Sequence, residues 1–327
     1  MCTAIAWQKD VFLFGRNLDL EYRYQEDVTI TPRKYPFPFR NGRISEKHPA
    51  IIGTAYVRTD YPLYYDGFNE YGLCAAGLSF PDYAYYVPET AQTEGISPFE
   101  LIPYILCHCK TCEEAVELLK QTIIADIPFS PELPNTPLHW MIADKKDAYV
   151  IEPTNDGIMF YENTLGILTN SPPFPFHLNN ASQYWHLSAN QPPCKYPKPL
   201  FPFSNGLGGI GLPGDLSSPS RFIRAVFTKE NSAGNANGTN MISQFFHILG
   251  SVGQQEGSVI VNNKYEKTVY SNCFSVTDGI YYYTTYHNRQ ITGVDLFAED
   301  LNGNTLIRYP MDEKESILWK NKKPDHS

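Results

Sequence analysis

Apolar residues gather in many short runs along the chain, and this pattern predicts mostly β-strands. The first two runs, Thr3–Trp7 and Val11–Phe14, are separated by Gln8-Lys9-Asp10 and predict a hairpin at the start of the chain. A second hairpin, with a charged tip, is expected around Asp144-Lys145-Lys146-Asp147. The other predicted strands are Val28–Thr31, Ile51–Val57, Leu73–Ser79, Leu138–Ile142, Ala148–Glu152, Gly166–Thr169, Lys267–Ser271 and Ile280–Thr284.

Helical patterns are fewer and carry clear start signals. Ser97-Pro98 supplies an N-cap and a first-turn proline ahead of an apolar face that ends at Leu106. Thr111-Cys112-Glu113-Glu114 has the sequence of a capping box, Ser218-Pro219 opens a third helix, and Ile242–Ser251 predicts a fourth. Strands come in runs with pairs of helices between them, so we predict an α+β fold of antiparallel sheets with helical layers outside.

Stretches rich in proline or asparagine predict long loops. They are Ser171–Phe176, Gln191–Phe203 and Asn231–Asn240. None of them marks a strong domain boundary, and no repeat divides the chain. We therefore expect residues 1–327 to form a single domain.

Composition excludes several classes of protein. The 327 residues are 42% hydrophobic, enough for a sizeable core, and 14% aromatic. The net charge is −9, and no Lys/Arg-rich block offsets it, which argues against nucleic acid as the main partner. No apolar run approaches the length of a membrane span, and no signal-peptide core develops before Lys9-Asp10. With an odd count of seven cysteines, we expect a cytoplasmic protein with reduced thiols and no membrane partner.

Cys2 is the residue that points most directly to chemistry. Initiator methionine is removed when the second residue is small, and this would leave a thiol and a free α-amine on Cys2. The unperturbed pKa of an α-amine, about 7.7–8.0, is close to that of a thiol, about 8.5, so the amine can take the thiol proton. The buried strand that follows would mount the nucleophile rigidly. On position alone, a chance cysteine beside the start is the favoured reading, and the strand that follows is what shifts the interpretation toward a nucleophile.

Arg16 and Asp19 follow the opening hairpin and would return to the level of Cys2 if its strands pair antiparallel. Arg16 could then favour the thiolate, and each unit of thiol pKa depression is worth about 1.4 kcal/mol. Asp19 could accept hydrogen bonds from the α-amine. A surface ion pair of little energetic value is the alternative.

Six motifs in order give this chain a resemblance to a known family. They are Met1-Cys2-Thr3-Ala4, Gly15-Arg16-Asn17-Leu18-Asp19, Asn69-Glu70-Tyr71-Gly72-Leu73, Ala76-Gly77-Leu78-Ser79-Phe80-Pro81, Leu168-Thr169-Asn170-Ser171-Pro172, and Gly211-Leu212-Pro213-Gly214-Asp215 through Ser220-Arg221-Phe222. Together they resemble the choloylglycine hydrolases, the N-terminal-nucleophile hydrolases that include conjugated bile salt hydrolases and penicillin V acylases. The resemblance runs from residue 2 to at least residue 286.

The resemblance implies a fold and a set of roles. The fold would be an αββα sandwich of two antiparallel sheets between helical layers, assembled as a homotetramer. Cys2 would be the nucleophile and amine base, with Arg16 and Asp19 beside it. Asn170 would supply a side-chain oxyanion donor, and Arg221 would support the site. Ser79 would supply the other donor through its backbone N–H, although relatives carry Asn or Tyr at this position.

The implied reaction is hydrolysis of the amide that joins a steroid acid to glycine or taurine, with no metal and no organic cofactor. Asp60-Tyr61-Pro62-Leu63-Tyr64-Tyr65-Asp66 and Pro137-Leu138-His139-Trp140 look more like the bile salt hydrolase branch; penicillin V or another N-acyl amide is the alternative substrate. A steroid needs an apolar, concave wall. Candidates for this wall, for each of which ordinary core packing is the alternative, are Leu20, Tyr24, Tyr65, Phe129, Leu133 and Leu138.

Other readings of the chain are weaker. Gly206-Leu207-Gly208-Gly209-Ile210-Gly211 fits a dinucleotide fingerprint literally but does not open a helix, so a glycine-rich loop is the better interpretation. Cys107, His108, Cys109 and Cys112 lack a second ligand pair at metal-site spacing. A glutamine amidotransferase would continue Cys-Gly-Ile and carry a synthase domain. A protein that only binds apolar ligands would not need Cys2.

Overall fold

The computed structural model describes residues 1–90, 94–198, 200–202, 204–234 and 240–321. Two large antiparallel sheets form its centre, and the N-terminal hairpin lies in the middle of the first sheet. Strands β1 (Cys2–Gln8) and β2 (Phe12–Leu20) lie between β13 (Ile167–Leu168) and β15 (Lys264–Ser275). The sheet continues through β16 (Ile280–Thr285) to β17 (Thr292–Asp295), and β14 (Val259–Val261) pairs with β15.

The second sheet has nine strands, with β9 (Cys74–Ser79) near its centre. On one side of β9 lie β10 (Leu138–Ala143), β11 (Ala148–Thr154) and β12 (Gly157–Glu162). On the other side lie β8 (Asp66–Asn69), β6 (Ile51–Arg58) with β7 (Tyr61–Tyr64), β3 (Asp27–Thr31) and β18 (Ile307–Pro310). A small hairpin of β4 (Phe37–Pro38) and β5 (Ile44–Ser45) stands apart.

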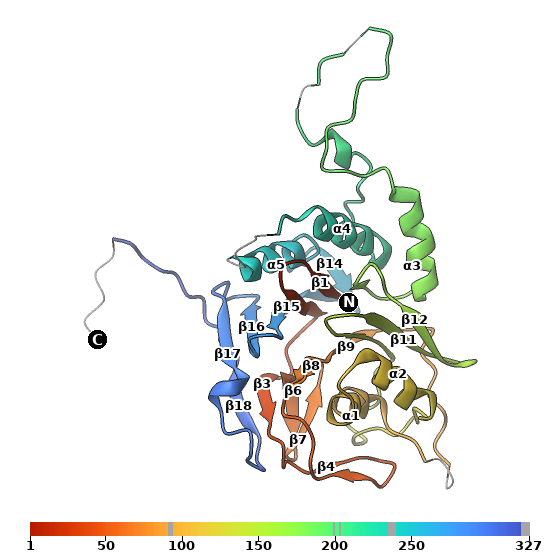
Figure 1. Ribbon diagram of the computed structural model, residues 1–327, viewed down its shortest axis with the longest axis vertical. Coiled ribbons are helices and arrows are strands. Elements are labelled where there is room, and N and C mark those ends of the chain that lie inside the picture. Colours follow the sequence, from red (N-terminus) through yellow and green to blue (C-terminus); the bar gives the residue numbers. More distant parts are fainter. Residues whose placement is uncertain (91–93, 199, 203, 235–239, 322–327) are drawn as a thin grey trace.

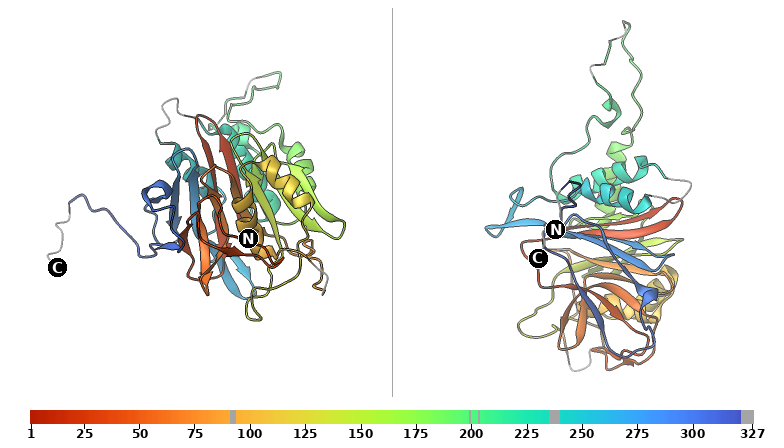
Figure 2. Two further views of the ribbon diagram at one scale, coloured as in Figure 1. Left: turned by 60° about the horizontal axis from the view of Figure 1, so that its bottom comes forward. Right: turned by 90° about the vertical axis from the view of Figure 1, so that its left-hand side faces the viewer.

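Helices cover the outer face of each sheet (Figures 1 and 2). The first sheet carries α4 (Ser218–Asn231) and α5 (Met241–Gly250), with α3 (Phe174–Ala181) packed against α4. The second sheet carries α1 (Leu101–His108) and α2 (Cys112–Lys120). The layers are therefore helix, sheet, sheet, helix, which confirms the expected αββα sandwich.

An aromatic cluster fills the space between the two sheets. Phe274 of β15 has its ring centroid 5.6 Å from that of Phe14 on β2 and 5.1 Å from that of Phe68 on β8. The ring centroid of Tyr281 on β16 lies 5.0 Å from that of Phe274. All four rings are fully buried, so the two sheets are joined by large apolar side chains.

The predicted strands and helices are all found, but several boundaries and elements differ. Strand β2 runs to Leu20, so Arg16–Asp19 lie inside it; the sequence pattern ended this strand at Phe14 because buried polar residues look like a strand end. The stretch Ser171–Phe176 was expected to be a loop, yet α3 begins at Phe174, with Pro173 and Pro175 compatible with a first turn. Short strands at sheet edges or beside proline, including β7, β12, β17 and β18, were not predicted.

The other sequence expectations have mixed outcomes. Thr111 Oγ1 accepts a hydrogen bond from Glu114 N, but the Glu114 carboxylate caps Lys110 N, so only half of the predicted capping box forms. Gln191–Phe203 has no helix or strand in its described residues. The expected loop Asn231–Asn240 lies partly outside the described residues.

Gly15 lets β2 approach β15 and α5 closely. A Cβ atom on Gly15 would stand 2.1 Å from Asn272 O of β15 and 2.8 Å from Cε1 of Phe245. We expect Gly15→Ala to destabilise the protein by about 3 kcal/mol, because neither contact can be relieved without moving packed elements. Urea unfolding measures this change, and Gly250→Ala, which meets no atom within 4 Å, is the control. Equal unfolding midpoints for the two variants would contradict the expectation.

Candidate active site

Cys2 is the first residue of β1 and is held between two neighbouring strands. In the pairing with β2, Cys2 lies opposite Leu18 and Ala4 lies opposite Arg16. In the pairing with β13, Ala4 lies opposite Leu168, and continuing this register two residues brings Asn170 opposite Cys2. The Cys2 residue is only 3% exposed. Because directly paired residues point to the same face, Cys2 and Arg16 share the face toward the second sheet.

Arg16 is a fully buried cation beside Cys2. Its Nη1 donates to Gly77 O at 2.6 Å and to Tyr65 O at 3.1 Å, so the second sheet fixes the guanidinium. Burial by itself lowers the pKa of Arg16, but Cys2, Tyr270 and other acidic neighbours raise it above its ordinary value. Arg16 therefore remains charged, and its charge lies on the face of the sheet that the Cys2 side chain shares.

Asp19 lies on the opposite face of β2, toward the helices, and is also fully buried. Its Oδ1 accepts a hydrogen bond from Thr268 Oγ1 at 2.6 Å, and its Oδ2 has no hydrogen-bond partner among the described residues. Burial raises the pKa of this carboxyl, although the N-terminal ammonium and Arg221 act against that shift. One carboxylate oxygen of Asp19 is thus free to accept a further hydrogen bond.

Asn170 connects Cys2 to α4 and to the second sheet. Its Oδ1 accepts from Cys2 N at 2.8 Å and from Arg221 Nη2 at 2.7 Å. Its Nδ2 donates to Ser79 O at 2.8 Å. Arg221 also donates to Cys2 O and to Thr3 Oγ1, so it anchors the first residues of β1. Burial lowers the pKa of Arg221, with nearby acidic groups opposing that shift.

The Ser79 backbone faces the same region. Ser79 is paired with Leu138 of β10, but Leu138 N donates to Tyr86 and Phe80 N donates to Pro137 O. Ser79 and Leu138 therefore form a non-hydrogen-bonded pair, in which the backbone N–H and C=O groups of each residue point away from the other strand. In a strand, the N–H and C=O of one residue point to the same side, and Ser79 O points to Asn170. The Ser79 N–H is thus directed toward the space beside Cys2 and Asn170.

Several buried polar residues behind the site were not found from the sequence. His177 bonds through Nε2 to Asn170 O at 2.8 Å, and burial lowers its pKa to about 4. A neutral imidazole donates this bond and fixes the Asn170 backbone. His139 is fully buried between Glu152 Oε1 at 3.2 Å and Thr169 O at 3.0 Å. Nothing in the sequence linked His177 to Asn170 beyond their separation of seven residues.

The six candidate wall residues are not all beside Cys2. Leu20 directly follows Asp19, Tyr65 offers its carbonyl to Arg16, and Leu138 lies opposite Ser79, so these three border the site. Tyr24 packs on Tyr56 and Tyr22 in the segment after Leu20. Phe129 packs against Tyr61 and Phe99, and Leu133 lies farther along the same segment.

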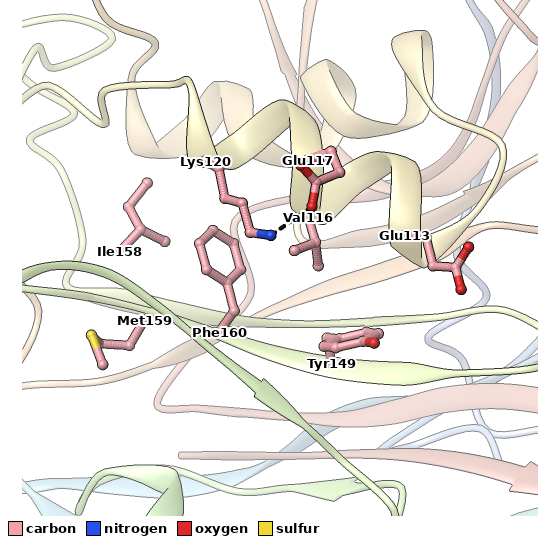
Figure 3. A pocket seen from close by; sticks show the side chains of 8 residues that line it. All are labelled: Glu113, Val116, Glu117, Lys120, Tyr149, Ile158, Met159 and Phe160. Atoms are coloured by element: carbon pink, nitrogen blue, oxygen red, sulfur yellow. Dashed lines mark hydrogen bonds and ion pairs between the residues drawn. The ribbon is translucent and has the colours of Figure 1, made fainter.

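A groove of about 700 Å³ lies elsewhere, between α2 and the β11–β12 hairpin (Figure 3). Val116 of α2 and Ile158 and Phe160 of β12 give the groove apolar sides, and Glu113, Glu117 and Lys120 of α2 add charged groups. None of its lining residues contacts Cys2, Arg16, Asp19, Asn170 or Arg221 in the hydrogen bonds described above.

Within the described ranges, no group of three or more His, Cys, Asp or Glu side chains could hold a metal ion. The helices of these ranges are also too short or too polar to cross a membrane.

Comparison with known proteins gives the same family along nearly the whole chain. Residues 2–309 match the model of the linear amide C–N hydrolases, choloylglycine hydrolase family. A protein of Lactiplantibacillus plantarum named bile salt hydrolase/transferase is 47% identical over 314 residues, which cover 95% of this chain and 97% of the relative. One of the same name from Clostridium perfringens is 38% identical, covering 97% of this chain and 99% of the relative.

Solved structures agree with these sequence matches. A variant of the conjugated bile acid hydrolase from Clostridium perfringens superposes with a TM-score of 0.91 at 36% identity, covering 98% of this chain and all of the other. The penicillin V acylase from Agrobacterium tumefaciens shares the fold, with a TM-score of 0.77 at 19% identity, covering 94% of this chain and 90% of the other. An N-terminal cysteine nucleophile fits this fold and the geometry around Cys2. The chain therefore belongs to the choloylglycine hydrolase family and is a hydrolase of linear amide C–N bonds.

Proposed function

We propose that the protein hydrolyses the amide bond of glycine- or taurine-conjugated bile salts, with Cys2 as nucleophile after removal of Met1. The observation that carries this proposal is the buried network joining Cys2, Asn170, Ser79 and Arg221. The substrate class is supported by the bile salt hydrolase/transferase relatives, which match over nearly their whole length.

The network suits an acyl transfer to sulfur. The Cys2 thiolate attacks the amide carbonyl, the S–C bond forms, and the oxyanion is stabilised by the Ser79 N–H and the Asn170 Nδ2 amide. The C–N bond then breaks, and the protonated α-amine of Cys2 gives its proton to the leaving nitrogen. Water attacks the resulting thioester, and the amine accepts a proton from this water as the C–O bond forms. The S–C bond then breaks, which releases the bile acid and restores the Cys2 thiolate.

Arg16 and Asp19 would act on different parts of Cys2. The side chains of Arg16 on β2 and Cys2 on β1 lie on the same face of the sheet, where the charge of Arg16 would stabilise the thiolate. Asp19 lies on the other face with an unpaired Oδ2 among the described residues, where it orients the amine. The two faces of β2 thus carry the charge that stabilises the thiolate and the carboxylate that orients the amine.

The apolar wall is expected at Leu20, Tyr65 and Leu138, which border the cluster, with Tyr24 beyond them. Phe129 and Leu133 would contribute only from the edge, since Phe129 packs on Tyr61 and Phe99. We further propose that the chain of residues 1–327 forms one domain, from which Met1 is removed. The reaction would need neither a metal nor an organic cofactor.

The assembly is proposed to be a homotetramer in the cytoplasm of a bacterium. The segment between α3 and α4 extends away from the four layers (Figure 1) and exposes large apolar side chains, among them Trp185 at 89% and Phe201 at 88%. Exposed aromatic groups of this kind support contact with further copies. The seven free cysteines support a reducing compartment, and the named relatives come from bacteria.

Release of amine from glycocholate, taurocholate and penicillin V by the purified protein tests this function. We expect release from at least one of the bile salts at a kcat/KM at least about tenfold above that for penicillin V, a preference worth about 1.4 kcal/mol in transition-state binding. Intact-protein mass confirms that Met1 is absent in the same sample. A preference for penicillin V would assign the other substrate class of the family, and no release from any of the three would contradict the proposal.

A further inference from the structure

A second buried carboxylate, Glu266, lies next to the start of the chain. Glu266 is on β15, two residues before Thr268, so both side chains lie on the face that Asp19 also uses. It is only 4% exposed. Its Oε1 is 2.6 Å from the Met1 ammonium, which also donates to Asp19 O at 2.9 Å. Glu266 is therefore one of the groups that surround the N-terminus.

Covalent geometry limits how far Glu266 can be from the Cys2 nitrogen. The nitrogens of Met1 and Cys2 are separated by three bonds, whose summed lengths are about 4.3 Å. With the contact of 2.6 Å to Met1 N, Oε1 can lie no farther than about 7 Å from Cys2 N. At this distance in a site shielded from water, a carboxylate acts strongly on the charge of an amine.

Removal of Met1 changes the charge balance around Glu266. It takes away the ammonium that neutralises Glu266 and creates a new one on Cys2. The groups that face Glu266 are the carboxylates of Asp19 and Glu21 and the guanidinium of Arg221. On its own strand, Lys267 is paired with Glu256 and lies over the Tyr286 ring. A buried carboxylate without a cation is costly, so the Cys2 ammonium is the charge best placed to replace that of Met1.

We propose that Glu266 is a positioning residue that, together with Asp19, holds the α-ammonium of processed Cys2 and sets the pH range in which Cys2 keeps its catalytic proton. This inference rests on the proposed use of Cys2 after Met1 removal. The thiol and the amine titrate as a coupled pair, and a nearby negative charge favours the protonated amine. Loss of that charge moves both limbs of the pH profile toward lower pH.

The test compares Glu266→Gln with wild-type protein whose Met1 is confirmed absent. We expect both limbs of the kcat/KM profile for glycocholate to move about one pH unit lower in Glu266→Gln. Glu266→Asp, which keeps the charge, should restore limbs close to those of wild type. Glu256→Gln removes a carboxylate from the exposed ion pair with Lys267 and should leave the profile unchanged.

Alkylation of Cys2 by iodoacetamide gives a readout that needs no substrate. Its rate against pH should show the same downward shift in Glu266→Gln, whatever amide the enzyme cleaves. Thus a shift with no bile salt hydrolysis would overturn the proposed substrate but support this role for Glu266. Unchanged limbs in both assays, in a variant whose circular dichroism matches wild type, would overturn the inference. So would an equal shift in Glu256→Gln.

Discussion

Cys2→Ser is expected to lower kcat for bile salt hydrolysis by about 10³-fold or more. A serine hydroxyl is far less acidic than a thiol, so neither the α-amine nor Arg16 can supply an ionised nucleophile in its place. Serine is small enough for Met1 to be removed and for β1 to keep its pairing with β2 and β13. The loss would therefore report on the sulfur and not on the position of the residue.

Glycine release from glycocholate measures this loss, with intact-protein mass to show the processed N-terminus. Cys194→Ser is the matched control because Cys194 is exposed and lies outside the network around Cys2. We expect it to keep full activity. A Cys2→Ser variant that retained more than about a tenth of wild-type kcat would contradict the role of Cys2 as nucleophile. Its activation free energy would then differ from that of wild type by less than about 1.4 kcal/mol.

Asn170→Ala is expected to lower kcat by about 10²–10³-fold, with a much smaller change in KM. The substitution removes the Asn170 amide that would donate to the oxyanion. It also removes Asn170 Oδ1, which accepts hydrogen bonds from Arg221 Nη2 and from the Cys2 nitrogen. Both effects act on the transition state more than on the bound substrate.

Steady-state kinetics on glycocholate separate the two parameters. Asn155→Ala, in the exposed turn between β11 and β12, removes the same side chain far from Cys2 and should match wild type. A rise in KM at unchanged kcat would show that Asn170 only contributes to substrate binding. That result would remove it from the proposed oxyanion site.

The pattern of residues located one part of the site, the family resemblance added a second part, and a third part is visible only in the folded structure. Cys2, Arg16 and Asp19 lie within a single hairpin, so their proximity follows from antiparallel pairing alone. Asn170 and Arg221 were reached only through the family resemblance, since no periodicity brings β13 beside β1. Glu266 and His177 carried no motif, because each acts through a contact that exists only after distant strands and helices have packed.

The same contrast holds for the fold. Strands with continuous apolar runs, such as β1 and β10, were predicted because burial on both faces requires such residues. The edge strands β12, β17 and β18 are short or carry many exposed residues, so their sequences differ little from those of loops. Helix α3 escaped prediction because its first turn contains proline and its last contains asparagine.

Cys2 begins a strand that has hydrogen-bonded neighbours on both sides, whereas Leu20, Tyr24 and Leu133 lie at a strand end or in connecting segments. The position of the Cys2 sulfur therefore depends on the pairing of β1 within its sheet, while the proposed apolar wall depends in part on loops. Under the proposed function, exchange of those loop residues would change which amides enter the site and would leave the nucleophile where it is.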